Sequence, residues 1–300
     1  MSLPDFLVVG AARAGTTSLH YYLRQHPGIF LPSQKEPSFF CFADKKIDYK
    51  NGRFAFAVTD FIRYKKLYKN ADSDLVKGDI STPYLYLHDE TIRNIKKYHP
   101  HPDALKIVIV LRNPVERAYS QYLWKVRDGR EDLSFEEALK TEKARMAQNY
   151  SFDYFYAHRG LYFSQVEDYI KHFKSVKIIF FDSFRNEFEV TMKNLCEFLG
   201  VDKDFEFTKR DKINSSSIPR FASLGRMMTV ESKVKFKILS VLPDGMRMSI
   251  KESFNKFNST GKTPEPIGES TVKWLNDFYR EDIQKLQSLI NSNLSHWIEP

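Results

Sequence analysis

Residues 6–18 read FLVVGAARAGTTS, and this stretch decides the fold that we expect. The residues before Gly10 are apolar and include two adjacent valines, which is typical of a buried parallel strand. Residues 17–25 then predict a helix that closes at a His-Pro-Gly sequence. A strand, a glycine-bounded turn and a helix in succession make the first half of a βαβ unit. The stretch therefore predicts an α/β protein.

The same alternation of apolar strands and amphipathic helices continues along the chain. We expect strands at residues 75–80, 106–111 and 176–181, and helices at residues 114–125, 136–147, 162–173, 187–199 and 270–291. This order predicts a P-loop-like three-layer fold, in which helices flank a central, mostly parallel sheet. We expect a single domain over residues 1–300, with mobile loops around residues 205–220 and 255–266.

Aromatic residues are abundant, with 25 Phe and 16 Tyr in 300 residues. Large apolar side chains are usually buried, so we expect a Phe-rich core; aromatic walls around a ligand are the alternative. In the last helix, a 3.6-residue spacing predicts an inward stripe of Trp274, Phe278, Ile283, Leu286 and Ile290.

The charge balance favours an anionic partner, because 46 basic residues outnumber 38 acidic ones and give a net charge of +8. The basic residues are spread along the chain, and neither zinc-ligand spacings nor RNA-binding aromatic signatures occur. We therefore expect a small polyanionic ligand rather than nucleic acid. No metal is expected, because none of the eight histidines has ligand spacing in a suitable context.

The sequence also bears on the compartment. Two cysteines, Cys41 and Cys196, provide no disulfide framework, which favours a reducing environment. Pro4 and Asp5 interrupt any leader-like start, and no apolar run approaches the roughly 20 residues of a membrane helix. We expect a cytoplasmic protein without stable membrane insertion, and the oligomeric state stays open.

The turn GAARAGTTS at residues 10–18 predicts a phosphate site. After a strand and before a helix, its backbone N–H groups form an anion nest at the helix N-terminus. The pattern resembles the P-loop G-x-x-x-x-G-K-[ST], but Thr16 replaces the lysine that serves the β and γ phosphates of a nucleoside triphosphate. This difference argues against ATP or GTP hydrolysis. A plain strand–helix turn with a capping threonine is the structural alternative.

A second anchor follows the strand at residues 106–111, where the chain reads RNPVERAYS from Arg112 to Ser120. Arg112 stands at the carboxyl end of a strand, where open α/β sheets bind ligands. Its guanidinium and the Ser120 hydroxyl suit a phosphate, although a strand-end arginine often pairs with a carboxylate instead. Arg117 is expected to be solvated or ion-paired. Two anchors indicate a nucleotide with phosphates at both ends.

GAARAGTTSL and RNPVERAYSQY together resemble the two cofactor motifs of sulfotransferases that use 3′-phosphoadenosine 5′-phosphosulfate (PAPS). The resemblance extends through KEPSFF from Lys35, GDISTPYLY from Gly78 and RGLY from Arg159, and ends near Gly261 and the last helix. It is closest to the heparan-sulfate-type and bacterial carbohydrate-type branch. The resemblance implies transfer of a sulfuryl group from PAPS, without a metal, to an acceptor hydroxyl or amine.

The resemblance also implies roles for individual residues. Glu36 is the general base, Arg13 stabilises the leaving group, and Lys262 belongs to a loop that closes over the nucleotide. The implied cofactor site comprises Arg13, Ala14, Gly15, Thr16, Thr17, Ser18, Arg112, Ser120, Gly261 and Lys262. Without the family, a surface partner of Lys35 is the less favoured alternative for Glu36.

Two positions depart from the family pattern. Arg13 stands where relatives commonly carry a lysine, which keeps the charge and changes the geometry. Ile80 and Ser81 stand where some relatives place another lysine, for which Lys35 is a candidate replacement. Four residues have two interpretations, as contacts of the acceptor or as structural residues. They are Asp79, Tyr84, His158 and Tyr162.

The acceptor stays open among saccharides, lipids and hydroxylated secondary metabolites, because acceptor contacts lie on loops without portable motifs. Two other functions remain as alternatives. One is a P-loop small-molecule kinase, which would need magnesium and ATP and is opposed by Thr16. The other is an inactive nucleotide-binding scaffold, which the Arg13 and Ile80 departures keep open.

Overall fold

A computed structural model describes residues 3–209 and 265–298 of the chain. Its centre is a five-stranded sheet in the order β2-β3-β1-β4-β5, and every pair of neighbouring strands is parallel. The strands are β1 (Phe6–Gly10), β2 (Ile29–Phe30), β3 (Val76–Ile80), β4 (Lys106–Leu111) and β5 (Ser175–Phe180). The sheet is thus wholly parallel, where the sequence predicted a mostly parallel one.

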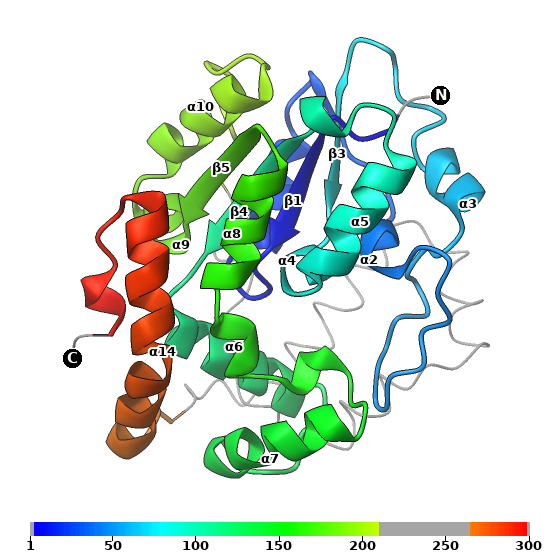
Figure 1. Ribbon diagram of the computed structural model, residues 1–300. Helices are drawn as coiled ribbons and strands as arrows, with labels where there is room; N and C mark the ends of the chain where they lie inside the picture. The colour runs from blue at the N-terminus through cyan, green and yellow to red at the C-terminus, as the bar shows by residue number, and fades with distance from the viewer. Residues whose placement is uncertain (1–2, 210–264, 299–300) are drawn as a thin grey trace.

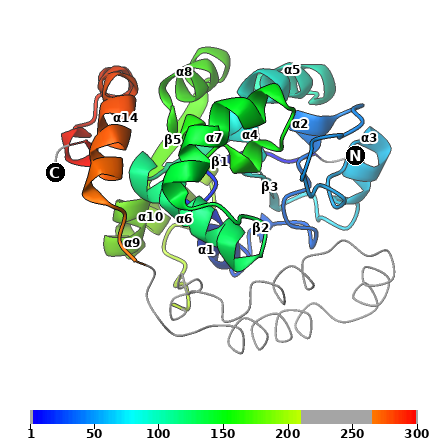
Figure 2. The same ribbon diagram turned by 90° about the horizontal axis from the view of Figure 1, so that it is seen from below.

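Helices cover both faces of the sheet and give the predicted three layers. Figure 2 shows α5 (His88–Tyr98) and α8 (Phe163–His172) on one side, and α1 (Thr16–Leu23) and α10 (Phe188–Leu199) on the other. Beyond the carboxyl ends of the strands lie α6 (Pro114–Arg127) and α7 (Phe135–Ala147) (Figure 1). The remaining helices of four or more residues are α2 (Phe39–Phe42), α3 (Phe61–Lys66), α4 (Pro83–Tyr86), α9 (Phe181–Asn186) and α14 (Glu269–Ile290).

Short helical turns complete the described chain. They are η1 (Pro102–Ala104), η2 (Phe152–Tyr154), η3 (His158–Gly160) and η4 (Ser295–Trp297). In the part of the chain that the structure describes, no helix combines the length and apolarity needed to cross a membrane.

The buried face of α14 differs from the predicted stripe. Its buried residues are Thr271, Leu275, Tyr279, Ile283 and Leu286, whereas Trp274 and Phe278 are 48% and 39% exposed. The two rings stack on each other with centroids 5.4 Å apart, which shields part of their surface outside the core. Ile283 and Leu286 are buried as predicted, whereas Leu275 and Tyr279 are buried in place of Trp274 and Phe278, each one residue further along the helix.

Arg117 is also placed differently from the prediction. It is 1% exposed and donates hydrogen bonds to the Tyr156 carbonyl and to Gln121 Oε1, at 3.3 Å for the latter. The guanidinium is therefore a buried connector between α6 and the segment before η3, rather than a solvated or ion-paired surface group.

Candidate active site

Two glycines shape the loop between β1 and α1. A Cβ atom on Gly10 would lie 2.6 Å from Leu85 Cβ, so the backbone approaches α4 as closely as only glycine permits. Gly15, with φ of 86°, caps α1 in the left-handed region. Because α1 begins at Thr16, the N–H groups of its first turn have no acceptor within the helix and are available to an anion.

Arg13 joins this loop to the second predicted anchor. Its Nε donates to Ser120 Oγ at 3.2 Å, and its carbonyl accepts from Arg112 Nη1 at 3.2 Å. The end of β4, the start of α6 and the glycine loop are therefore tied together at one residue. Arg13 itself has a φ of 71°, which residues other than glycine rarely adopt, so the loop aims its side chain at some conformational cost.

The charge around Arg13 is strongly positive. Burial, together with the nearby Arg127 and Arg112, lowers the pKa of Arg13 to about 10, against the opposing effect of Asp128. Arg13 is still cationic at neutral pH. An incoming phosphate or sulfate would relieve the repulsion among these guanidinium groups, so the cluster favours anion binding.

Arg112 is held in place by two neighbours. Its guanidinium lies over the Phe181 ring at 4.7 Å and donates to Glu116 Oε2 at 3.1 and 2.8 Å. This carboxylate contact is the structural alternative considered above for a strand-end arginine. The carboxylate is 54% exposed, and a phosphate with two charges competes effectively for the same fork.

Glu36 lies across the loop from Arg13. It has a φ of 53°, its side chain is 27% exposed, and Thr82 Oγ1 donates to its Oε2 at 3.3 Å. Burial raises the pKa of Glu36 above its ordinary value, and the charge of Lys35 opposes that rise. A carboxylate with a raised pKa inside a cavity is a stronger base than an exposed one.

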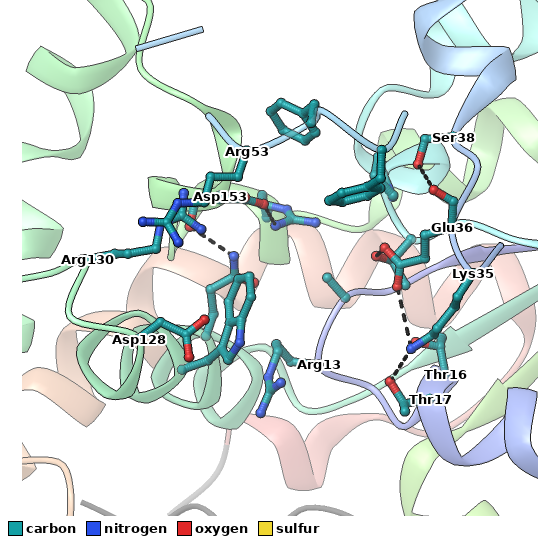
Figure 3. Close-up of a pocket in the computed structure, with 18 of the residues that line it drawn as sticks. Arg13, Thr16, Thr17, Lys35, Glu36, Ser38, Arg53, Asp128, Arg130 and Asp153 are labelled. Carbon is teal, nitrogen blue, oxygen red and sulfur yellow. Dashed lines mark hydrogen bonds and ion pairs between the residues drawn. The ribbon is translucent and has the colours of Figure 1, made fainter. Parts of the chain in front are cut away.

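Lys35 connects Glu36 to the glycine loop. Its Nζ donates to Thr17 Oγ1 at 2.7 Å and lies 3.9 Å from Glu36 Oε1 (Figure 3). The ammonium group therefore reaches the first turn of α1, beside the N–H groups that are available to an anion. This position supports Lys35 as the replacement cation.

Arg13, Lys35 and Glu36 line a cavity of about 440 Å³, whereas Arg112 and Ser120 are not part of its wall. Glu36 and Lys35 project from one side, Arg13 lies at the base, and Asp153, Arg130 and Arg53 stand on the opposite side (Figure 3). The opposite wall was not predicted from the sequence. Its residues come from separate segments that only the tertiary fold brings together.

Asp153 organises that opposite wall. Its carboxylate lies 3.4 Å from Lys125 Nζ and 3.5 Å from Arg159 Nη1. Burial opposes its ionisation, but Lys125, Arg159 and Arg130 outweigh this effect and keep the pKa of Asp153 below its ordinary value. Lys125 is fully buried, and burial lowers its pKa to about 7. The sequence signal for Arg159 was the RGLY motif that begins at this residue, but the motif predicted no role for it.

The candidate acceptor contacts, all of which the structure describes, do not line the cavity. Phe39 and Phe40 are buried in the core, and the aromatic residues that line the cavity are Phe54, Phe56 and Trp124. Asp79, Tyr84 and Tyr162 are fully buried and are not part of the cavity wall, which rules out direct contact with an acceptor there. His158 is exposed and contacts Tyr86 through Nδ1. Gly261 and Lys262 lie outside the described residues.

One group of possible metal ligands occurs among residues 3–209 and 265–298. His88, Asp89 and Asp168 place one ligand atom each within 4.8 Å of the others. His88 Nδ1 already lies 2.7 Å from Asp168 Oδ2, and none of the three residues lines the cavity. The group is a hydrogen-bonded contact between α5 and α8.

Comparison with known proteins now decides the family. Residues 4–206 match the Sulfotransferase family. The chain belongs to this family of enzymes. A crystal structure of a sulfotransferase from Alicyclobacillus acidocaldarius is similar over the full length of both chains, with 30% sequence identity and a TM-score of 0.74.

Curated relatives in the Sulfotransferase family are longer and more distant. The membrane-associated sulfotransferase kil1 of Dictyostelium discoideum is 30% identical over 127 residues, which are 42% of this chain and 24% of that protein. The bifunctional heparan sulfate N-deacetylase/N-sulfotransferase 2 of Homo sapiens is 24% identical over 214 residues, covering 69% of this chain and 23% of that protein. The chain thus spans about a quarter of the length of these two relatives.

Proposed function

We propose that this protein transfers a sulfuryl group from PAPS to a hydroxyl or amine of an acceptor, with Glu36 as the general base. The observation that carries the proposal is the arrangement around Arg13, which joins the glycine loop to Arg112 and Ser120. One cationic site then spans two anchors, as a nucleotide with phosphates at both ends requires. Family membership supports the same reaction class.

The donor fits the residues present. The 5′-phosphosulfate would take the N–H groups at the start of α1 together with Thr16, Thr17 and Ser18. The 3′-phosphate would take the Arg112 guanidinium and the Ser120 hydroxyl. Thr16 in place of the P-loop lysine leaves no cation dedicated to a γ-phosphate, which favours PAPS over ATP.

The proposed transfer is an in-line displacement. An acceptor oxygen or nitrogen forms a bond to sulfur while the bond between sulfur and the bridging phosphate oxygen breaks. The acceptor proton passes to Glu36, and the leaving adenosine 3′,5′-bisphosphate carries the released electron pair on its phosphate. Arg13 and Lys35, on either side of the loop, stabilise the charge that develops there.

The cavity wall opposite Glu36 favours an acceptor that carries negative charge. Four arginines line it, Arg53, Arg127, Arg130 and Arg159, and they outnumber the two carboxylates there, Asp128 and Asp153. Trp124 adds a flat surface of the kind that packs against a sugar ring. We therefore propose an anionic saccharide as the acceptor class, ahead of lipids and other hydroxylated metabolites.

Transfer of ³⁵S from labelled PAPS tests the proposal with two probes. N-desulfated heparin presents amines and hydroxyls beside carboxylates, and dextran presents hydroxyls without charge. We expect labelling of the heparin probe, and its loss in Glu36→Gln while adenosine 3′,5′-bisphosphate still binds. Donor binding without labelling of either probe would contradict the acceptor class. Retained transfer in Glu36→Gln would remove Glu36 as the base.

Nucleotide binding and PAPS consumption by the same protein distinguish the kinase and scaffold alternatives. A kinase would bind ATP with magnesium at least as tightly as adenosine 3′,5′-bisphosphate. A scaffold would bind the bisphosphate and leave PAPS unconsumed with every acceptor. The intact arrangement of Glu36, Lys35 and Arg13 around one cavity opposes a scaffold.

A further inference from the structure

Asp79 is a buried carboxylate beneath the turn that bears Glu36. It lies on β3, is fully buried, and accepts three hydrogen bonds from hydroxyl groups. Tyr64 and Tyr84 donate to its Oδ2 at 2.8 and 2.7 Å, and Ser81 donates to its Oδ1 at 2.7 Å. Within the described residues Asp79 forms no ion pair, so hydroxyl donors alone stabilise its charge.

Two of these hydroxyls also reach the backbone of the Glu36 turn. Ser81 Oγ accepts from the Ser38 N–H at 3.0 Å, and the Tyr84 hydroxyl accepts from the Phe40 N–H at 3.3 Å. The Phe40 N–H belongs to the first turn of α2 and has no acceptor within that helix. The turn itself is strained, because Glu36 and Ser38 have φ values of 53° and 55°.

The direction of each hydroxyl follows from the chemistry of the carboxylate. An ionised carboxylate only accepts hydrogen bonds, and a hydroxyl has a single hydrogen to donate. The hydrogens of Ser81 and Tyr84 therefore point at Asp79, which leaves their lone pairs to face the Ser38 and Phe40 N–H groups. An amide or a protonated carboxyl would present its own donor and strand one hydroxyl hydrogen in a buried place.

We propose that Asp79 is a positioning residue for Glu36. Its carboxylate orients the hydroxyls of Ser81 and Tyr84, which hold the left-handed turn that aims Glu36 into the cavity. The inference rests on the proposed role of Glu36 as the base. Asp79 contacts neither the donor loop nor the cavity and acts only through the turn.

The other phenol and thiol groups near Asp79 stay protonated, so each keeps a hydrogen to donate. Burial, and next the charge of Asp79, raise the pKa of the Tyr64, Tyr68 and Tyr84 phenols well above their ordinary value. Burial and Asp79 also raise the pKa of the Cys41 thiol, so that these groups stay protonated. Glu36 is the remaining neighbour that affects Asp79, and its carboxylate disfavours a second negative charge.

The chain offers a matched pair of phenol deletions. Tyr84→Phe removes the hydroxyl between Asp79 and the Phe40 N–H. Tyr68→Phe removes a buried hydroxyl of the same cluster that donates to the Gly78 carbonyl at 3.3 Å and interacts with Tyr64, away from the turn. Asp79→Asn and Ser81→Ala complete the set, with Glu36→Gln as the reference for loss of the base.

Two readouts test the proposal. Amide hydrogen exchange at Ser38 and Phe40, followed by NMR, needs no acceptor; transfer of ³⁵S to N-desulfated heparin gives the rate at saturating PAPS. We expect Tyr84→Phe and Asp79→Asn to speed exchange at one or both amides at least tenfold and to lower the transfer rate at least tenfold. Affinity for adenosine 3′,5′-bisphosphate should stay within threefold, and Tyr68→Phe should match the wild type.

The outcomes separate this inference from the proposed function. Glu36→Gln without activity, combined with normal exchange and normal rates in Tyr84→Phe and Asp79→Asn, would overturn the role of Asp79 alone. Full activity in Glu36→Gln would overturn the base and with it the inference. If Asp79→Asn does not fold, Ser81→Ala and Tyr84→Phe give the same answer, because each removes a single hydroxyl.

Discussion

Arg13 Nε donates a hydrogen bond to Ser120 Oγ at 3.2 Å, across 107 positions of sequence. This contact joins the loop after β1 to the helix after β4, two elements whose strands are neighbours in the sheet. The glycine loop and the Arg112–Ser120 anchor are thus parts of one site. A nucleotide with phosphates at both ends would contact both.

The Arg13–Ser120 contact predicts energetic coupling in donor binding. Arg13→Lys keeps the charge but removes the Nε donor, and Ser120→Ala removes its acceptor. A hydrogen bond to a charged group contributes about 1.5–3 kcal/mol, so we expect each change to weaken binding of adenosine 3′,5′-bisphosphate roughly tenfold or more. Calorimetry on both variants and their combination should show a double variant little worse than either single one. Fully additive losses would contradict the coupling.

Lys35 is expected to matter for the rate more than for binding of the product nucleotide. Its ammonium group lies 2.7 Å from Thr17 Oγ1, where negative charge grows only as the sulfuryl bond breaks. Lys35→Met should lower the transfer rate at saturating PAPS by about 100-fold, the scale of a lost oxyanion donor. Lys35→Arg, which keeps the charge, serves as the control. Equal loss in both variants would point to a packing role instead.

The pH dependence of transfer follows from the raised pKa of Glu36. A base must be ionised to accept a proton, so the rate should fall as the pH drops below a pKa that burial holds above the ordinary value. The charge of Lys35 lowers that pKa, so Lys35→Met should move the acid limb to higher pH. Rate profiles of the wild type and Lys35→Met measure this shift. A movement to lower pH would be the wrong sign for a Glu36 base.

The raised pKa of Asp79 should make the free energy of unfolding depend on pH. Burial raises the pKa of Asp79 from 3.8 to about 6, so folding favours its protonated form. The stability that this preference contributes is present below pH 3.8 and is lost as the pH rises through about 6. Relative to Asp79→Asn, the wild type should therefore lose roughly 2 kcal/mol of unfolding free energy between pH 4 and pH 7. Urea unfolding of both proteins at each pH measures this change. A wild type that becomes more stable relative to Asp79→Asn as the pH rises would contradict the prediction.

The sheet was largely predictable because buried parallel strands are continuous apolar runs. The strand at residues 106–111 has the predicted bounds, and β1 and β3 are recovered within a residue. The two-residue strand β2 has no such run and was not predicted. In α14 the helix was recovered, but the rings of Trp274 and Phe278 pair outside the core, which helical spacing alone does not reveal.

The two candidate phosphate anchors and Glu36 could be named from the sequence because each lies in a local motif, and their roles stay predictions. The wall formed by Arg53, Arg130 and Asp153 was not, because its members belong to separate segments that only the fold brings together. The sequence pattern pointed to Asp79 but not to the role proposed for it at the Glu36 turn. Sequence patterns give neither hydroxyl geometry nor the contact between Tyr84 and the Phe40 N–H.

The central claim is that the Gly10 loop and Arg112 form one site for a nucleotide with phosphates at both ends. Isothermal calorimetry with adenosine 3′,5′-bisphosphate, adenosine 5′-monophosphate and ATP tests it most directly. We predict that the bisphosphate binds at least tenfold more tightly than the monophosphate, and that Arg112→Ala weakens bisphosphate binding by about 10- to 100-fold, because an arginine–phosphate pair contributes about 1.5–3 kcal/mol. ATP binding equal to or tighter than that of the bisphosphate would contradict the claim.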